Sequence, residues 1–255
     1  MRLPNCVLEE MEKDATLSAA ERGLYLLAWA RDPASLSGLG RLVRMDRGSV
    51  GRACRHLAER GWMKMVKHPG GIRAAAIIPD ACQIVMAHDL EDEYDMVTFG
   101  GEYLTRKRVD WYLRRDEYVC NARPALLENP ETKRRLEYDT YDRKQALATE
   151  YNGSQHYRET PDYRQEEVGK QKAHDLMKQS MSEREGVTLL TFTYRDLRPG
   201  VLEARLDAAV PHFRRGYVDM RGPYMKVLNR ISTHYAAKVD RAEQAAAERE
   251  SVQQR

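Results

Sequence analysis

The chain has 255 residues, of which 42% are hydrophobic and 32% are charged, so it is long enough to bury a hydrophobic core in one or two domains. No apolar run approaches the roughly 18 residues that a membrane span needs, and no basic start precedes an apolar block, so we expect neither a membrane protein nor a secreted one. The four cysteines are separated by 48, 28 and 38 positions, which excludes the close spacing of a zinc or redox motif. We therefore expect buried thiols in a cytoplasmic protein.

Charge is unevenly distributed along the chain. The net charge is only +3, but nine basic and two acidic residues lie between Ser37 and Arg73, which makes that segment +7. An acidic stretch follows at 86–97, and the tail after about 236 is polar. These shifts predict four parts, namely a first domain at 1–85, an acidic linker at 86–97, a second domain at 98–200, and C-terminal helices with a polar tail at 201–255.

The first domain carries local signals for helices. Ser18 and Glu21 form a capping-box pattern, which predicts a helix that begins at about residue 19. Asp46 is placed as the N-cap of a later helix that ends at Gly61. The glycine-containing turn His68–Gly71 lies between two strand-like segments and predicts a hairpin. The expected elements are three helices and a hairpin, at 19–30, 36–44, 46–61 and 62–78.

This order of helix, helix, turn, helix and hairpin is that of a winged helix, and residues 15–80 resemble the winged helix-turn-helix domains of bacterial DNA-binding proteins. The resemblance implies that the third helix enters the major groove of DNA while basic side chains neutralise phosphates. The candidate nucleic-acid contacts are Arg47, Ser49, Arg52, Arg55, Lys64, Lys67 and Arg73. Two other interpretations stay open, because many winged helices bind protein partners and many basic helix faces are only solvated.

The second domain contains two strand-like segments with acidic residues. They lie at 136–141 and 146–151 and are joined by a polar turn. If the two segments pair as a hairpin, strand alternation places Asp139 on one face of the first strand and Glu150 on one face of the second, so that two carboxylates converge. Carboxylate oxygens suit Mg²⁺, which assists phosphodiester hydrolysis. A two-sided polar hairpin at a sheet edge would have a similar sequence.

The run Glu150–Tyr157 reads E-x-N-G-x-Q-H-Y and, together with the acidic strand before it, resembles the PD-(D/E)XK restriction-endonuclease-like superfamily, in particular very-short-patch-repair-like nucleases. The resemblance covers about 98–197. It implies an α/β (α+β) domain with a mixed sheet flanked by helices. It also implies an endonuclease that depends on Mg²⁺ or Mn²⁺ and acts on DNA.

The resemblance assigns roles to acidic residues of this chain. Asp139 and Glu150 are the implied metal ligands, and Glu137 is the alternative to Asp139. Glu102 corresponds to an upstream acid that some members supply, although a glutamate in the first turn of a helix is also favoured by the helix dipole.

The sequence departs from the family pattern at one position. The motif lysine expected two residues after the second acid is Asn152 here, which puts the usual stabilisation of the transition-state charge in doubt. Gln155 and His156 are implied to lie near the scissile phosphate. Either of them, or Lys172 from the following helix, could replace the lysine, because a donor or cation needs only to reach the same point in space.

The sequence thus predicts a metal-dependent endodeoxyribonuclease that a winged helix targets to DNA, of a kind suited to a phage, a mobile element, defence or repair. The alternative is a catalytically inactive DNA-binding regulator on a nuclease scaffold, which Asn152 favours. An RNA nuclease also stays open, since neither motif distinguishes the sugar. A homodimer is a further option, but no heptad pattern supports it.

Overall fold

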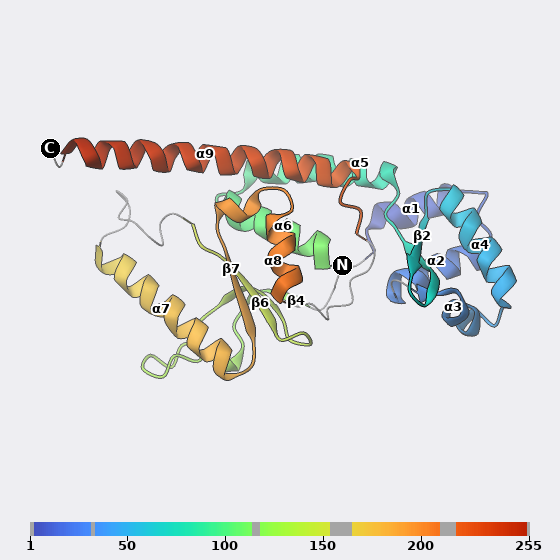
Figure 1. Cartoon of the computed structure of the whole chain (residues 1–255), viewed down its shortest axis with the longest axis horizontal. Helices are drawn as coiled ribbons and strands as arrows, with labels where there is room; N and C mark the ends of the chain where they lie inside the picture. Colours follow the sequence, from blue (N-terminus) through green and yellow to red (C-terminus); the bar gives the residue numbers. More distant parts are fainter. Residues whose placement is uncertain (1–2, 32–33, 114–117, 154–164, 210–217, 254–255) are drawn as a thin grey trace. The chain divides into compact units, whose positions relative to one another are not determined.

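The computed structural model describes residues 3–31, 34–113, 118–153, 165–209 and 218–253, which form a mixed α and β fold, as the sequence predicts (Figure 1). The chain separates into two compact units. Unit 1 comprises residues 1–93, 111–114 and 214–227, and unit 2 comprises residues 94–110, 115–213 and 228–255.

Unit 1 contains a helical cluster and a small antiparallel sheet with strand order β1-β3-β2. Its first elements are α1 (Asn5–Lys13), α2 (Ala19–Arg31), β1 (Ala34–Ser35), α3 (Leu36–Val43), α4 (Arg47–Glu59), β2 (Met63–His68) and β3 (Gly71–Ala76). The three predicted helices and the hairpin are therefore confirmed. Helix α1 and the two-residue strand β1 were not predicted.

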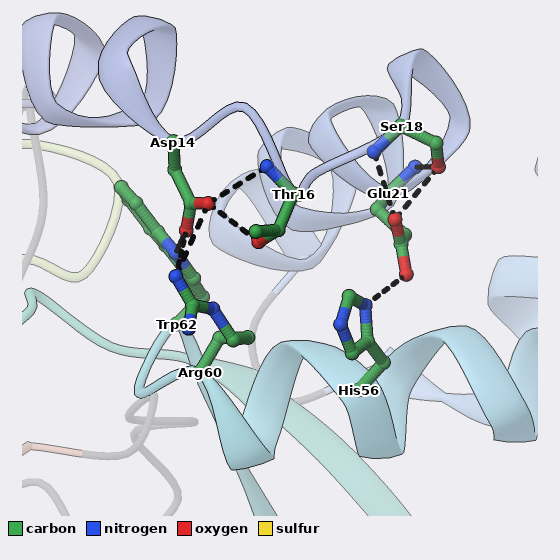
Figure 2. Close-up of polar contacts among 7 residues, drawn as sticks. All are labelled: Asp14, Thr16, Ser18, Glu21, His56, Arg60 and Trp62. Carbon is green, nitrogen blue, oxygen red and sulfur yellow. Dashed lines mark hydrogen bonds and ion pairs between the residues drawn. The ribbon is translucent and has the colours of Figure 1, made fainter.

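The helix boundaries in unit 1 follow the local signals. The carboxylate of Glu21 accepts hydrogen bonds from the backbone N–H and the hydroxyl of Ser18, at 2.8 and 2.7 Å, so the predicted capping box is formed. The other oxygen of Glu21 lies 2.6 Å from Nδ1 of His56 on α4 (Figure 2). Asp46 caps α4 by accepting from the N–H of Ser49. Gly61 ends this helix with a φ of 79°, a conformation that glycine adopts without steric cost.

A polar junction joins the loop after α1 to the start of the hairpin. The carboxylate of Asp14 accepts from the backbone and hydroxyl of Thr16, from Nε1 of Trp62 at 3.0 Å and from Arg60 at 3.3 Å (Figure 2). These hydrogen bonds hold the pKa of Asp14 well below its usual range, and the bond from Thr16 has the largest effect. The ionised carboxylate is thus a structural part of unit 1.

The acidic segment that was expected to be a linker is helical. Most of 86–97 belongs to α5 (Asp80–Met96), which includes buried apolar side chains such as Ala87 and Leu90. Acidic side chains on the exposed side of a helix need no loop, since they are solvated there. The prediction of buried thiols is correct for Cys54 and Cys82, but Cys6 is only half-buried and Cys120 is exposed on a strand.

Unit 2 is built on a four-stranded mixed sheet with order β4-β5-β6-β7. Strands β4, β5 and β6 pair antiparallel, and β7 runs parallel to β6. The strands are β4 (Tyr118–Ala122), β5 (Tyr138–Asp142), β6 (Leu147–Tyr151) and β7 (Thr188–Phe192). The helical elements are α6 (Gly100–Leu113), η1 (Ala125–Leu127), α7 (Gln165–Arg184), η3 (Tyr194–Leu197), α8 (Val201–Ala209) and α9 (Pro223–Gln253), of which α6 and α9 also supply residues to unit 1.

Helices cover both faces of this sheet. Met177 and Met181 of α7 pack with Leu189 of β7, whereas Arg205 of α8 lies over the ring of Phe192. Leu189 and Phe192 are three positions apart on one strand, so their side chains point to opposite faces. Helix α7 therefore packs on one face of the sheet and α8 on the other, as the predicted layered arrangement requires.

None of the described helices is long and apolar enough to cross a membrane.

Candidate active site

The two acids implied to bind a metal lie at neighbouring positions on paired strands. Thr140 of β5 and Thr149 of β6 are partners in register, and their hydroxyl oxygens are 2.6 Å apart. Asp139 precedes Thr140 and Glu150 follows Thr149, so on these antiparallel strands the two acids occupy the next pair of positions. Strand alternation places both of their side chains on the face opposite to the two threonines. The backbone N–H of Tyr151 donates to Oδ2 of Asp139 at 2.7 Å, which fixes that carboxylate at the end of β6.

A lysine from α7 reaches this pair of acids. Nζ of Lys178 donates to Oε2 of Glu150 in a close ion pair, and it also contacts the backbone carbonyl of Glu137 at 3.3 Å. The side chains of Lys178 and Glu150 are only 10% and 8% exposed, so the pair is nearly dry. Lys172, the candidate that the sequence suggested on the same helix, is exposed. Lys178 therefore supplies an ammonium beside Glu150, whereas Asn152 cannot supply one.

Sequence reasoning missed Lys178 because it lies 28 residues after Glu150. A signal was nevertheless present in the helix. Lys178 is flanked by Met177 and Met181, which belong to the side of α7 that packs on the core, and Ser182 one turn later is fully buried. A lysine among the buried positions of a helix requires a partner, since an unpaired buried charge is costly.

Burial changes the acidity of both carboxylates. Desolvation raises the pKa of Glu150 to about 7, although the ammonium of Lys178 acts in the opposite direction. Desolvation also raises the pKa of Asp139, against the hydrogen bond from Tyr151 and the charge of Lys178. Desolvation is the largest cause of the raised pKa values of Glu150 and Glu102, and the negative charge of Asp139 raises both further. The acids of this site therefore repel one another.

The donor set fits a hard divalent cation such as Mg²⁺. Oε1 of Glu150 is buried and has no hydrogen-bond partner among the described residues, so this oxygen would be available to coordinate a cation. Mg²⁺ is commonly held by one or two carboxylates and keeps several waters, so Asp139 and Glu150 are a sufficient protein contribution. The described residues contain no group of three or more His, Cys, Asp and Glu side chains placed to hold a metal ion.

Glu102 lies near these acids but has a partner of its own. Its Oε1 accepts from Nη2 of Arg106, one turn later on α6, at 2.6 Å. Burial, and then the negative charge of Asp139, raise the pKa of Glu102. Glu137, the alternative to Asp139, forms an ion pair with Arg123 at 2.6 Å on a more exposed part of the surface.

The end of β6 is supported from α6 and α9. A Cβ atom at Gly101 would lie 2.1 Å from the ring of Tyr151, so only glycine allows this ring to pack against α6. The hydroxyl of Tyr151 is 3.0 Å from that of Tyr235 on α9. Since the backbone of Tyr151 holds Asp139, this packing also fixes the position of that acid.

The remaining sequence candidates of this domain are the residues after β6. Asn152 is buried, and its backbone N–H donates to the carbonyl of Phe192 at 2.7 Å. Gln155 and His156 lie outside the described residues.

The candidate nucleic-acid contacts all belong to unit 1. Five of them are exposed and two are half-buried; the exposed ones are Arg47, Arg52, Arg55, Lys64 and Lys67, and the half-buried ones are Ser49 and Arg73. On α4, Nη2 of Arg52 donates to the hydroxyl of Ser49 at 2.9 Å. The opposite side of α4 buries Val50, Cys54 and Leu57, so the basic side chains lie on the solvent side as predicted.

Comparison with known proteins yields partial viral relatives. No family model and no solved structure matches the chain. The chain is similar to the uncharacterized protein 307L of Invertebrate iridescent virus 6, with 35% identity over 95 residues that cover 31% of this chain and 48% of the viral protein. It is also similar to the uncharacterized protein 033L of Invertebrate iridescent virus 3, with 37% identity over 75 residues that cover 29% of this chain and 39% of that protein. The chain therefore spans less than half the length of these relatives, whose names state no activity.

Proposed function

We propose that unit 2 hydrolyses phosphodiester bonds of DNA in a reaction that depends on Mg²⁺ or Mn²⁺. The observation that carries this proposal is the meeting of Asp139, Glu150 and Lys178 from β5, β6 and α7. Two adjacent carboxylates with a lysine are the residue types that the nuclease resemblance requires, and the lysine comes from a helix instead of the motif position. Buried acids with raised pKa values are also typical of functional sites.

In this proposal each residue has a distinct task. Asp139 and Glu150 would hold the divalent ion, which when bound neutralises phosphate charge and makes water a better nucleophile. The N–H of Tyr151 orients the Asp139 carboxylate. Lys178 favours the ionised form of the buried Glu150 and provides positive charge for the phosphate as it gains negative charge in the transition state.

Unit 1 would hold the DNA as a winged helix. The exposed arginines of α4 and the lysines of β2 supply the phosphate contacts. Asp46 caps the N-terminal end of α4. We propose a cytoplasmic location for the protein, since its cysteines are free thiols.

The alternative, an inactive DNA-binding regulator, is favoured by Asn152 and disfavoured by Lys178. The two are separated by incubating purified protein with supercoiled plasmid, linear duplex, single-stranded DNA and RNA in Mg²⁺, in Mn²⁺ and in EDTA. We expect metal-dependent nicking of DNA by the wild type and its loss in Asp139→Ala and Glu150→Ala. Salt-sensitive DNA binding by all three proteins, without cutting in either metal, would leave the regulator. Cutting of RNA without cutting of DNA would show that the substrate is RNA.

The DNA contacts of unit 1 have their own test. Replacing Arg52 and Arg55 together by alanine should weaken duplex binding and reduce the slope of log Kd against log salt by about one for each phosphate that the protein no longer neutralises. Fluorescence anisotropy over a salt series in EDTA measures both quantities. Lys13→Ala removes an exposed charge at the end of α1 and should leave the slope unchanged. Equal slopes for the wild type and the double variant would remove α4 from the interface.

A further inference from the structure

A second cation, besides Lys178, lies near the candidate active site. Arg106 of α6 donates through Nη2 to Oε1 of Glu102 at 2.6 Å and to Oδ1 of Asn121 at 3.1 Å. Asn121 has a φ of 51° and interrupts the pairing of β4 with β5. A carboxylate from the same helix and an amide from a strand thus hold one nitrogen of the guanidinium.

Another nitrogen of this guanidinium lacks a hydrogen-bond partner in the described part of the chain. Nε of Arg106 is buried and has no hydrogen-bond partner among the described residues, although the side chain as a whole is 29% exposed. A guanidinium presents its N–H groups as a planar fork that matches two oxygens of a phosphate or carboxylate. Glu102 and Asn121 thus orient a guanidinium whose side chain is partly exposed, as contact with an oxyanion requires.

The strand register places Asn121, the partner of Arg106, across from Asp139. Cys120 pairs with Thr140 and Ala122 pairs with Tyr138, so the position of Asn121 on β4 lies across from that of Asp139 on β5. Nη2 of Arg106 donates to Oδ1 of Asn121, whereas Nζ of Lys178 donates to Oε2 of Glu150. Arg106 from α6 and Lys178 from α7 therefore contact neighbouring positions around the two carboxylates of β5 and β6.

We propose that Arg106 is a catalytic residue that binds the non-bridging oxygens of the phosphodiester under attack, and that Glu102 and Asn121 are positioning residues that hold its guanidinium. This inference rests on the proposed nuclease function and names a residue that acts on the substrate. It gives Glu102 the task of orienting Arg106, instead of the role of upstream acid that the resemblance implied. An ammonium in place of Arg106 would keep the charge but lose the fork, so lysine is a poor substitute.

Single-turnover cleavage of a duplex over a Mg²⁺ titration tests this assignment. Arg106→Met should lower the maximal rate about 100-fold, and Arg106→Lys should recover only part of it. Glu102→Gln should lower the maximal rate without weakening the apparent Mg²⁺ affinity, and combining it with Arg106→Met should add little further loss. Lys107→Met, which removes a charge from the next position on α6, is the matched control and should cleave at the wild-type rate. Circular dichroism and thermal unfolding verify that each variant is folded.

Guanidinium ions added at millimolar concentration provide a readout that a structural role would not change. They should restore part of the rate of Arg106→Met but none of the rate of Glu150→Ala. A wild-type rate in folded Arg106→Met would overturn the proposal. So would a Glu102→Gln variant that loses Mg²⁺ affinity while it keeps the maximal rate, because Glu102 would then be a metal ligand.

Binding in Ca²⁺ separates this inference from the proposed function. Ca²⁺ takes the same oxygen ligands, and anisotropy of a labelled duplex reports binding without a need for cleavage. If the wild type cleaves in no metal, the nuclease proposal fails, yet weaker Ca²⁺-dependent binding by Arg106→Met than by Lys107→Met would still support the phosphate contact. Equal binding by these two variants, in a protein that does not cleave, would overturn both.

Discussion

Replacing Lys178 by methionine should lower the rate of metal-dependent DNA cleavage by about 100- to 1000-fold. The ammonium of Lys178 is the cation in direct contact with Glu150, and both groups are buried. Without it, Glu150 is a buried acid with no ion-pair partner, so protonation becomes more favourable and the carboxylate is less available for a metal ion. Cleavage of supercoiled plasmid at saturating Mg²⁺ measures the loss.

The matched comparison is Lys172→Met on the same helix. Lys172 is exposed, so its replacement should leave the cleavage rate and the unfolding temperature close to those of the wild type. A loss of cleavage in Lys172→Met, with cleavage retained in Lys178→Met, would show that the lysine is supplied from the position that the sequence suggested instead.

The Lys178 variant also loses stability, because removal of one partner from a buried ion pair typically costs about 3–5 kcal/mol. The double variant Glu150→Gln with Lys178→Met removes both charges and should unfold at a higher temperature than Lys178→Met alone. It should remain inactive, since both functional groups are gone. A folded, inactive double variant therefore shows that loss of cleavage in Lys178→Met does not follow from unfolding.

Cleavage at limiting Mg²⁺ should decrease about tenfold per pH unit below a midpoint near neutrality. Burial raises the pKa of Glu150 to about 7, so this carboxyl is mostly protonated at lower pH and binds a cation poorly. Because metal and proton compete for the same group, a higher Mg²⁺ concentration should shift the midpoint to lower pH. Initial rates over a pH series at two Mg²⁺ concentrations measure the shift.

DNA binding in EDTA over the same pH series is the control, since a decrease in binding would lower the rate for another reason. A midpoint that stays below pH 5 and does not respond to Mg²⁺ would contradict the assignment of Glu150 as a ligand.

The raised pKa of Glu150 also predicts how the stability of the protein depends on pH. The pKa of Glu150 is higher in the folded state than in the unfolded chain, so its stabilising contribution is present at low pH and is lost as pH rises through about 7. Added Mg²⁺ should therefore raise the unfolding temperature more at pH 8 than at pH 6.

Much of the local structure could be predicted because its signals act within one helical turn or one strand. Ser18 and Glu21 satisfy backbone groups at the start of α2, and Gly61 ends α4 because it adopts a positive φ. Alternation within a strand likewise places Asp139 and Glu150 on faces that can converge. Helix α1 and strand β4 carry no comparably strong local signal and were not predicted.

The acidic segment at 86–97 shows the limit of composition as a guide. The acidic run predicts a linker, and a boundary between the two units falls within it after Glu93, but the run is helical and its acidic residues lie on the exposed side of α5. Charge density reports solvation and does not distinguish a solvated helix from a loop.

The sequence by itself predicted α2, α3, α4 and the hairpin of unit 1, and the pair of strands that contains Asp139 and Glu150. Tertiary structure decided which cations accompany those acids. Lys178 reaches Glu150 because α7 packs on the sheet that contains β6, and Arg106 of α6 donates to Asn121 of β4. These contacts join residues at least 15 positions apart, where no local preference acts, and they depend on strand register and on the packing of helices against the sheet.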